Sequence, residues 1–597
     1  MRPPKDDDKT GHDIAMFAQA NDPTTSATPA ANAPALAAHW IDGRLGLLAA
    51  AAAAGAFNLS FQYPELAFLV PVWMFALVSL AHARTKRLAF ALAALAGVGM
   101  YAPQLWFFVD ILGPLAAGLW LLLAGVIAVF ALLGRWCLAY LPRPLALVTL
   151  PFLWTGLEYF RGEMAHLRFT WLSAGYALWP CGELVRLDLL GVYGLGFVLM
   201  LGVCGLLLLP HKVTWAAVAL AVGGLAVLVN WPQDNPQAAP AGMAVVVPVR
   251  TTPDAPPRRV DLLPVSQDAP GIAVVGRPMY RPPQATRPAH RRRAWTPLPG
   301  PVFVGVQLED ATVAETLAAL DAALARCPQA DVLVLGEYAF PAEPPPAVRD
   351  WCRLNEKYLI AGGVERLNGR QFYNTAFVLD RRGSIVHRQA KSVPVPFFRD
   401  GEPAPARQLW QSPWGPIGVC ICYDMSYRRV MDDFVRQGAR LIVIPTMDRD
   451  TWGPQEHLLH SRVTPVRSSE YGVPIFRVCS SGISQAVDRR GRVVADLPQP
   501  GQGQVLAASI AMDARTTLPA DHAFGPAMTV ATGGVTAVLL AASMAQWIVL
   551  RRRAHRRGAD DSPPQGPTSP PDGLRAEVRS LPPVRPRIRR SAIAPER

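Results

Sequence analysis

Apolar residues are concentrated in two stretches of the 597-residue chain, at 44–231 and 528–550. A helix that crosses a membrane needs about 20 mainly apolar residues. On that criterion the second stretch predicts one span, bounded sharply by Arg551, and the first stretch predicts seven. The seven are expected near residues 44–59, 65–83, 88–109, 112–134, 145–160, 189–209 and 213–231.

Basic residues in the short connections predict how these spans are oriented. Lysine and arginine gather in cytoplasmic loops of membrane proteins. One alternating topology places every basic connection inside the cell, together with both termini, and places residues 232–527 outside. The basic positions are Arg84, Lys86 and Arg87, then Arg135 and Arg143, then His211 and Lys212, and finally the cluster that begins at Arg551.

From Val302 onward the pattern changes to short apolar strands that alternate with helices, which is typical of a layered α/β domain. Strands are expected at 302–307, 331–335, 358–364, 375–379, 417–422 and 441–444, and a helix at 313–326. The predicted organisation is a disordered segment (1–43), a seven-helix membrane domain (44–231), a Pro/Arg-rich tether or insertion with short strand-like pieces (232–300), a catalytic domain (301–527), a C-terminal transmembrane helix (528–550) and a basic disordered tail (551–597).

Composition agrees with a membrane protein. Hydrophobic residues make up 51% of the chain and charged residues 17%, against about 25% charged in soluble domains. Much of the net charge of +13 lies in arginine runs, some of them directly after the last apolar span, where lipid contact and topology explain them. Because the sequence has no zinc-finger spacing, RNP motif or P-loop, nucleic acid is not an expected partner. The eight cysteines form no CxxC pair, so no cofactor or metal is expected.

Three polar residues stand at the ends of predicted strands, where α/β enzymes place reactive groups. They are Glu337, Lys391 and Cys422. Each alone has an ordinary explanation, as a strand cap, a surface lysine or a buried small hydrophobe. Together they suit nucleophilic catalysis, because a thiol needs a base and a cationic neighbour. Glu337 would take the proton, and Lys391 would stabilise the oxyanion. Cys420 is a rival nucleophile on the same strand face, but it lies deeper, so Cys422 is preferred.

Around these residues the sequence resembles the carbon-nitrogen hydrolase (nitrilase) superfamily. The resemblance is carried by GEYAF at Glu337, QAKSVPVPF at Lys391 and GVCICYDMSY at Cys422, with support from YNTAFVLDRRG and RSSEYGVPIFRVCSSGIS. With membrane spans on both sides of this region, the chain resembles the apolipoprotein N-acyltransferase family. TWLSAGYALWP and GVYGLGF are also similar to that family, and the resemblance covers about residues 44–550, without much of 243–300.

The resemblance implies an α-β-β-α sandwich outside the inner membrane of a bacterium, carried by a multi-pass helical domain. It also implies a ping-pong reaction. Cys422 would take an acyl chain from a phospholipid as a thioester, and the N-terminal amine of a diacylglyceryl-apolipoprotein would then attack it. A monomer without a cofactor is expected. Tyr423 matches the family tyrosine, and Asp424 stands where a glutamate is usual.

Some segments depart from the family pattern. The segment after Lys391 reads PFFRDGE where PFGE is usual, so Asp400 and Glu402 are the nearest acids, and Glu402 is tentatively assigned to the site. The family's NDxWFG becomes Met447–Gly453, and the tryptophan segment after Gln307 is missing. The alternatives left open are a divergent acyltransferase with another lipid or amine, a membrane-tethered amidase that passes the acyl group to water, and a non-catalytic scaffold.

Three weaker signals have ordinary interpretations. His457 and His460 share a helical face, but a zinc site would need a further ligand, so packing or solvation is favoured. GVYGLG at 191–196 has the composition of a dinucleotide fingerprint, but it opens an apolar span, where close helix packing is the better explanation. Glu158, Arg161 and Glu163, at a helix end, could contact lipid headgroups or form structural ion pairs.

Overall fold

The fold is described from a computed structural model of residues 41–182, 184–230, 245–247, 300–396, 398–499, 501 and 503–560. The predicted segments 1–43, 232–300 and 551–597 lie largely outside these residues. Helix α14 (Asp521–Asp560) nevertheless includes the first residues of the predicted tail. Strand β1 (Val245–Val247) lies within the predicted tether and pairs with strand β13 (Val505–Ser509).

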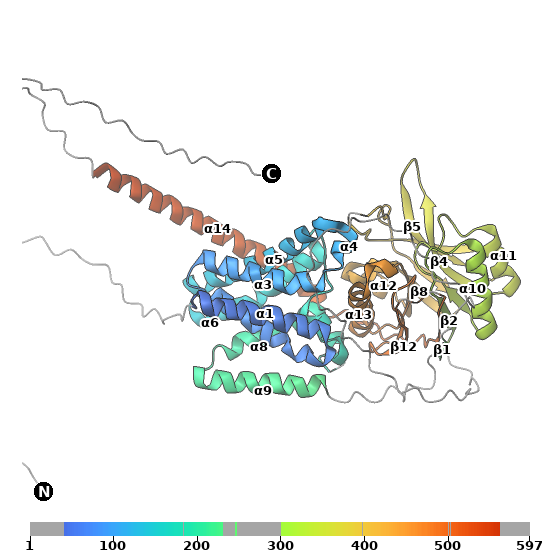
Figure 1. The fold of residues 1–597 in the computed structure, drawn as a ribbon, viewed down its shortest axis with the longest axis horizontal. Helices are drawn as coiled ribbons and strands as arrows, with labels where there is room; N and C mark the ends of the chain where they lie inside the picture. Colours follow the sequence, from blue (N-terminus) through green and yellow to red (C-terminus); the bar gives the residue numbers. More distant parts are fainter. Residues whose placement is uncertain are drawn as a thin grey trace, which may run out of the picture. The chain divides into compact units, whose positions relative to one another are not determined.

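The chain up to Thr536 forms one compact unit with a helical part and an α/β part (Figure 1). Four segments of the described chain are long and apolar enough to cross a membrane: Gly43–Gln62, Pro64–Ala81, Phe108–Tyr140 and Leu187–Leu206. The eight-span topology stays a prediction. The helices are α1 (Gly43–Gln62), η1 (Pro64–Leu69), α2 (Val70–Ala81), α3 (Lys86–Gln104), α4 (Phe108–Leu112), η2 (Gly113–Leu115), α5 (Ala116–Tyr140), α6 (Arg143–Tyr159), η3 (Phe160–Met164), α7 (Ala174–Ala177), η4 (Trp179–Cys181), α8 (Leu187–Leu206) and α9 (His211–Val229).

Small residues let the helices pack closely, while large apolar ones face outward. A Cβ on Gly97 of α3 would lie 2.6 Å from the Cα of Ala124 on α5, so that contact requires glycine. Leu48, Leu121 and Leu220 are among the most exposed side chains. Exposed leucines over several helices suit a lipid-facing surface, since a water-facing surface of this kind would be an aggregation hazard.

The α/β part consists of two sheets that pack face to face. Ring centroids of Phe303 and Phe476, one from each sheet, are 5.6 Å apart. The first sheet has the order β1-β13-β2-β3-β4-β5-β6 and the second β12-β11-β10-β9-β8-β7. The remaining strands are β2 (Val302–Val306), β3 (Val332–Val334), β4 (Tyr358–Arg366), β5 (Phe372–Leu379), β6 (Ile385–Ala390), β7 (Leu409–Ser412), β8 (Gly415–Val419), β9 (Leu441–Thr446), β10 (Ile475–Cys479), β11 (Ser484–Val487) and β12 (Val493–Leu497).

Helices cover the outer face of each sheet. Helices α10 (Val313–Arg326) and α11 (Pro346–Asn355) share one core with the first sheet, which includes Leu320 and Trp351. Helices α12 (Arg428–Arg436) and α13 (Pro454–Tyr471) pack on the second, where Gly418 of β8 approaches Phe434. The predicted α-β-β-α sandwich with a helical membrane part is therefore confirmed.

A buried ionic cluster joins the two parts of this unit. Asp521, at the start of α14, accepts a hydrogen bond from the backbone N–H of Tyr193 on α8 (2.9 Å) and forms an ion pair with Arg428 of α12. Glu163 accepts from the backbone N–H of Arg428 at 3.2 Å. Its carboxylate also lies 3.8 Å from Arg467 Nη2, so of the two interpretations for Glu163 the structure favours ion pairing. A Cβ at Gly191 would collide with Asp521, which explains the glycine-rich start of α8 as close packing.

Candidate active site

The structure brings Glu337 and Lys391 into direct contact from separate strands of the first sheet. Lys391 Nζ lies 2.8 Å from Glu337 Oε1 and 2.7 Å from Asp400 Oδ2. All three side chains are buried. Asn374 on β5 donates to both carboxylates, at 2.6 Å to Glu337 and 2.8 Å to Asp400. One ammonium and one amide therefore hold two carboxylates side by side.

The two carboxylates have different electrostatic roles. Burial alone would disfavour the Lys391 ammonium, but Asp400 and Glu337 outweigh burial and hold its pKa well above the usual value. The pKa of Asp400 is lowered because Lys391 overcomes the effect of its burial. The pKa of Glu337 is raised, first by burial and then by the charge of Asp400. Asp400 thus keeps the ion pair with Lys391, and Glu337 is the carboxylate suited to accept a proton.

Cys422 begins a 3-10 turn, η6 (Cys422–Ser426), directly after β8 and has a φ of 52°. This left-handed conformation is strained for a residue with a Cβ, and strain of this kind gathers at reactive positions. Its Sγ lies 3.9 Å from the backbone oxygen of Met447. Burial, together with the charge of Glu337, raises the thiol pKa well above the usual value, against the effect of Lys391. The resting group is therefore a thiol that needs a base.

The other sequence-predicted residues lie around this turn, and Tyr423 also lines the cavity described below. Asp424 accepts hydrogen bonds from the backbone N–H groups of Ser392 (3.0 Å) and Val393 (2.7 Å), and so ties the segment after Lys391 to the nucleophile turn. Tyr423 donates from its hydroxyl to the backbone oxygen of Arg168 (3.0 Å), in the helical part. Cys420 is fully buried and does not line the cavity described below.

Glu402 is not brought into the site. It is exposed, and its carboxylate accepts a hydrogen bond from Gln371 at 3.2 Å. Between Asp400 and Glu402 the chain turns at Gly401, whose φ is +82°. This turn directs the two acids to different places, so Asp400 takes the position that was tentatively assigned to Glu402.

This difference gives a matched pair of substitutions. We expect Asp400→Asn to lower the rate of thioester formation by about 100-fold, because Lys391 loses one of its two counter-charges and pairs with Glu337 alone, which then becomes a weaker base. Glu402→Gln should stay within about twofold of the unchanged protein, as exposed substitutions usually do. Single-turnover acylation measures both rates. Equal losses in the two variants would contradict the placement of Asp400.

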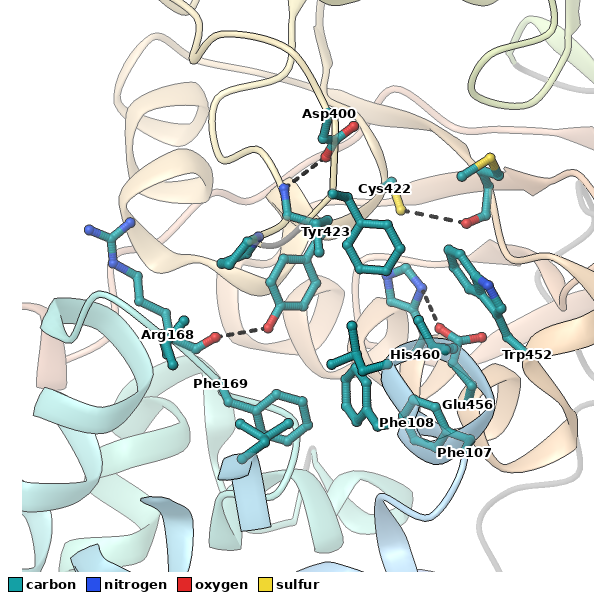
Figure 2. Close-up of a pocket in the computed structure, with 18 of the residues that line it drawn as sticks. Phe107, Phe108, Arg168, Phe169, Asp400, Cys422, Tyr423, Trp452, Glu456 and His460 are labelled. Carbon is teal, nitrogen blue, oxygen red and sulfur yellow. Dashed lines mark hydrogen bonds and ion pairs between the residues drawn. The ribbon is translucent and has the colours of Figure 1, made fainter. Parts of the chain in front are cut away.

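Glu337, Lys391 and Cys422 line a cavity of about 430 Å³ that both parts of the unit enclose. Figure 2 shows Asp400 and Cys422 above the pocket and the rings of Phe107, Phe108 and Phe169 below it. Its volume lies in the range of about 300–1,000 Å³ that is usual for ligand pockets. Most of the lining is apolar. It is formed by Phe107, Phe108, Ile111, Leu112, Leu115, Gly118, Leu119, Leu167, Phe169, Trp171, Val395, Pro396, Phe398, Met447 and Trp452.

Asp448 and His460 also lie at Cys422. A ring nitrogen of His460, a carboxylate oxygen of Asp448 and Cys422 Sγ lie within 4.8 Å of one another. His457 is directed elsewhere, with its two nitrogens 3.2 Å from Gln499 Oε1 and 2.9 Å from the backbone oxygen of Arg449. The two histidines therefore do not converge on one site.

The cysteine, aspartate and histidine at this point could hold a metal ion, but the negative charge of Asp448 already has partners in the protein. Asp448 forms an ion pair with Arg477 and accepts from His460 at 2.7 Å. A cation placed here would have to displace one of these partners and would face Lys391 as well. We therefore assign no metal to this group. Sequence reasoning did not place Asp448 or Asn374 in the site, and it set His460 aside, because only the folded chain brings these residues to Cys422.

Comparisons with known proteins agree with this geometry. The chain matches the family model for the apolipoprotein N-acyltransferase N-terminal domain over residues 53–206 and the model for carbon-nitrogen hydrolases over residues 306–519. Among curated relatives, an apolipoprotein N-acyltransferase of Geobacter metallireducens is 24% identical over 494 residues, which are 73% of this chain and 84% of that protein. One from Brucella melitensis is 28% identical over 38% of this chain and 48% of that protein.

The matched regions of the first relatives are shorter. The chain aligns with 15% of an apolipoprotein N-acyltransferase of Chlamydia pneumoniae (14% of this chain, 36% identical) and with 29% of one of Rhizobium rhizogenes (23% of this chain, 30% identical). Among solved structures, a carbon-nitrogen hydrolase of Helicobacter pylori is 16% identical with a TM-score of 0.32, covering 36% of this chain and 90% of that one. By its two family models and its curated relatives, the chain belongs to the apolipoprotein N-acyltransferase family of the nitrilase superfamily.

Proposed function

We propose that this protein moves an acyl chain from a phospholipid to the N-terminal amine of diacylglyceryl-cysteine lipoproteins, through a thioester on Cys422. One observation carries the proposal. The buried group of Glu337, Lys391 and Cys422 opens into an apolar cavity whose far wall is built from the helical part of the molecule. An apolar chain can lie against that wall with its carbonyl at the sulfur.

In the first half-reaction the proton of the Cys422 thiol passes to Glu337, and the sulfur attacks the ester carbonyl of the phospholipid. Lys391 stabilises the oxyanion, because its charge is fixed by two carboxylates before the substrate arrives. When the intermediate collapses, the C–O bond breaks and the glycerol oxygen takes the proton back from Glu337. A lysophospholipid leaves, and the acyl chain stays on the sulfur.

In the second half-reaction the lipoprotein amine attacks the thioester. The carbon–nitrogen bond forms, the carbon–sulfur bond breaks, and the thiol is restored. The apolar lining keeps water from the thioester until the amine arrives. Within the segment after Lys391, Val395, Pro396 and Phe398 line the cavity, and Phe398 packs near Trp452 with centroids 6.2 Å apart. We infer that this segment covers the thioester.

The topology and the partners are part of the same proposal. We infer a monomer in the bacterial inner membrane, with the catalytic domain on the periplasmic side and both termini in the cytoplasm. The basic connections at Arg84–Arg87 and at Arg135–Arg143 support this orientation. The phospholipid donor and the lipidated acceptor are both held by the bilayer, which favours a cavity reached from the membrane surface.

The proposal is tested by incubating the purified protein with a labelled phospholipid. A hydroxylamine-sensitive label should form on the protein and should move to the N-terminal amine of a diacylglyceryl-cysteine peptide when that peptide is added. Release of free fatty acid at the same rate with and without the peptide would overturn the proposal and would indicate a hydrolase.

The cavity also predicts a dependence on acyl-chain length. Gly118 of α5 lines the cavity, whereas Gly125 of the same helix does not, and each has open space around the position of a Cβ. Gly118→Phe should lower acylation by long-chain phospholipids by about 10-fold, since overpacking costs typically 1–3 kcal/mol. Short-chain donors should be affected less, and Gly125→Phe serves as the control. An equal loss with every chain length would contradict this use of the cavity.

A further inference from the structure

His460 of α13 lies at Cys422 and lines the cavity, but the two half-reactions described above do not use it. The side chain is buried and lines the cavity, and its ring stacks on Trp171 with centroids 4.8 Å apart and planes 17° apart. Figure 2 shows the ring in the pocket between Glu456 and the turn that holds Cys422. The aromatic stack fixes the plane of the imidazole and leaves its edge to interact with a ligand.

Asp448 fixes which ring nitrogen carries the proton. Its Oδ1 lies 2.7 Å from His460 Nδ1. Although burial opposes ionisation, His460 and Arg477 hold the pKa of Asp448 far below its usual range. An ionised carboxylate only accepts hydrogen bonds, so Nδ1 carries the proton and Nε2 carries a lone pair.

The second nitrogen has no partner. His460 Nε2 is buried and makes no hydrogen bond among the residues that the structure describes. An unsatisfied buried polar atom costs about 1–3 kcal/mol, so a donor from a ligand is expected there. Burial lowers the pKa of the imidazole more than Asp448 raises it, which favours the neutral ring with a free lone pair on Nε2.

Glu337 is less suited to serve a second substrate. Its Oε1 accepts from Lys391 and Asn374, and its Oε2 accepts from the backbone N–H of Met447 at 2.9 Å. These three donors hold the carboxylate in place for the thiol and the leaving alcohol. The attacking amine must also lose a proton, and the free lone pair on His460 Nε2 can accept it.

We propose that His460 accepts the proton of the attacking amine during acyl transfer, with Asp448 as its positioning residue. The inference rests on the proposed function and assigns a second base to it. As the neutral amine attacks the thioester, the carbon–nitrogen bond forms and the new ammonium gives one proton to His460 Nε2. The carbon–sulfur bond then breaks, the sulfur keeps its electron pair, and the imidazolium returns the proton to Cys422.

The experiment separates the two half-reactions by single turnover. Full-length His460→Gln should form the acyl thioester within about threefold of the unchanged rate. It should transfer the acyl group to a diacylglyceryl-cysteine peptide about 100- to 10,000-fold more slowly, the range expected for loss of a general base. His457→Gln on the same helix is the control and should preserve both rates. Thioester formation reports that each variant is folded.

Two further readouts would not respond to a structural role. Added imidazole should restore transfer in His460→Ala, which leaves space for it. Below the pKa of the imidazole, which burial lowers from its usual value, the unchanged protein should lose transfer with a slope of about two, one proton from the amine and one from the imidazole, and His460→Gln with a slope of about one. The charged or titratable groups that face His460 are Asp448, Glu456, Arg477, Lys391 and Cys422.

Several results would overturn the inference. The first is an equal loss of both half-reactions in His460→Gln, and the second is transfer at the unchanged rate in that variant. The third is failure of imidazole to restore transfer in His460→Ala together with an unchanged pH slope in His460→Gln. Loss of activity with a chelator and its recovery with Zn²⁺ would also overturn it, because His460 would then be a metal ligand. If the unchanged protein forms a thioester but gives the acyl group only to water, the proposed function fails whatever His460 does.

Discussion

Replacing Cys422 with alanine should abolish the acyl thioester and lower acyl transfer by about 10,000-fold or more, as expected when a nucleophile that acts together with its base is removed. The physical reason is that, among the described residues, Cys422 is the cysteine that lines the cavity. Cys420, two residues earlier, is fully buried, and burial raises its pKa well above the usual value. Intact-protein mass after incubation with a phospholipid measures the adduct directly.

The matched control is Cys420→Ala. It should keep the thioester and cost stability only through a small cavity, typically about 1 kcal/mol. A peptide map that places the acyl group on Cys420, or a thioester that survives in Cys422→Ala, would refute the assignment of the nucleophile.

Replacing Lys391 with methionine should destabilise the protein by about 3–5 kcal/mol, the usual cost of removing one partner from a buried ion pair. Lys391 is the one ammonium between Glu337 and Asp400, at 2.8 and 2.7 Å, and all three are buried. Without it, two carboxylates face each other in a low-dielectric site. Thioester formation should disappear as well, because the oxyanion loses its cation.

The pH dependence of this loss has a definite sign. In the variant the carboxylates have folded-state pKa values above their unfolded values, so folding takes up protons and the deficit should shrink as pH falls. Adding Asp400→Asn should recover part of the stability without recovering activity. Thermal unfolding in detergent across a pH series tests both statements. A Lys391→Met protein as stable as the unchanged one would show that the three groups are not coupled.

The sequence by itself determined the parts of this protein that depend on local pattern. Runs of apolar residues predict membrane helices because a spanning segment must satisfy its backbone internally. The alternation of short strands with helices from Val302 predicts a layered α/β domain. Strand ends at Glu337, Lys391 and Cys422 predict the reactive group, because a thiol nucleophile needs a base and a cationic neighbour.

Only the tertiary structure decided which neighbours complete that group. Asp400 and Glu402 are equivalent acids in the sequence, and the left-handed turn at Gly401 sends one to Lys391 and the other to the surface. His460 of α13 lies at Cys422 and stacks on Trp171, which comes from the helical part of the unit. The apolar wall comes from helices about 300 residues earlier in the chain. Such contacts depend on how elements far apart in the chain pack together, and a local pattern of residues does not predict this packing.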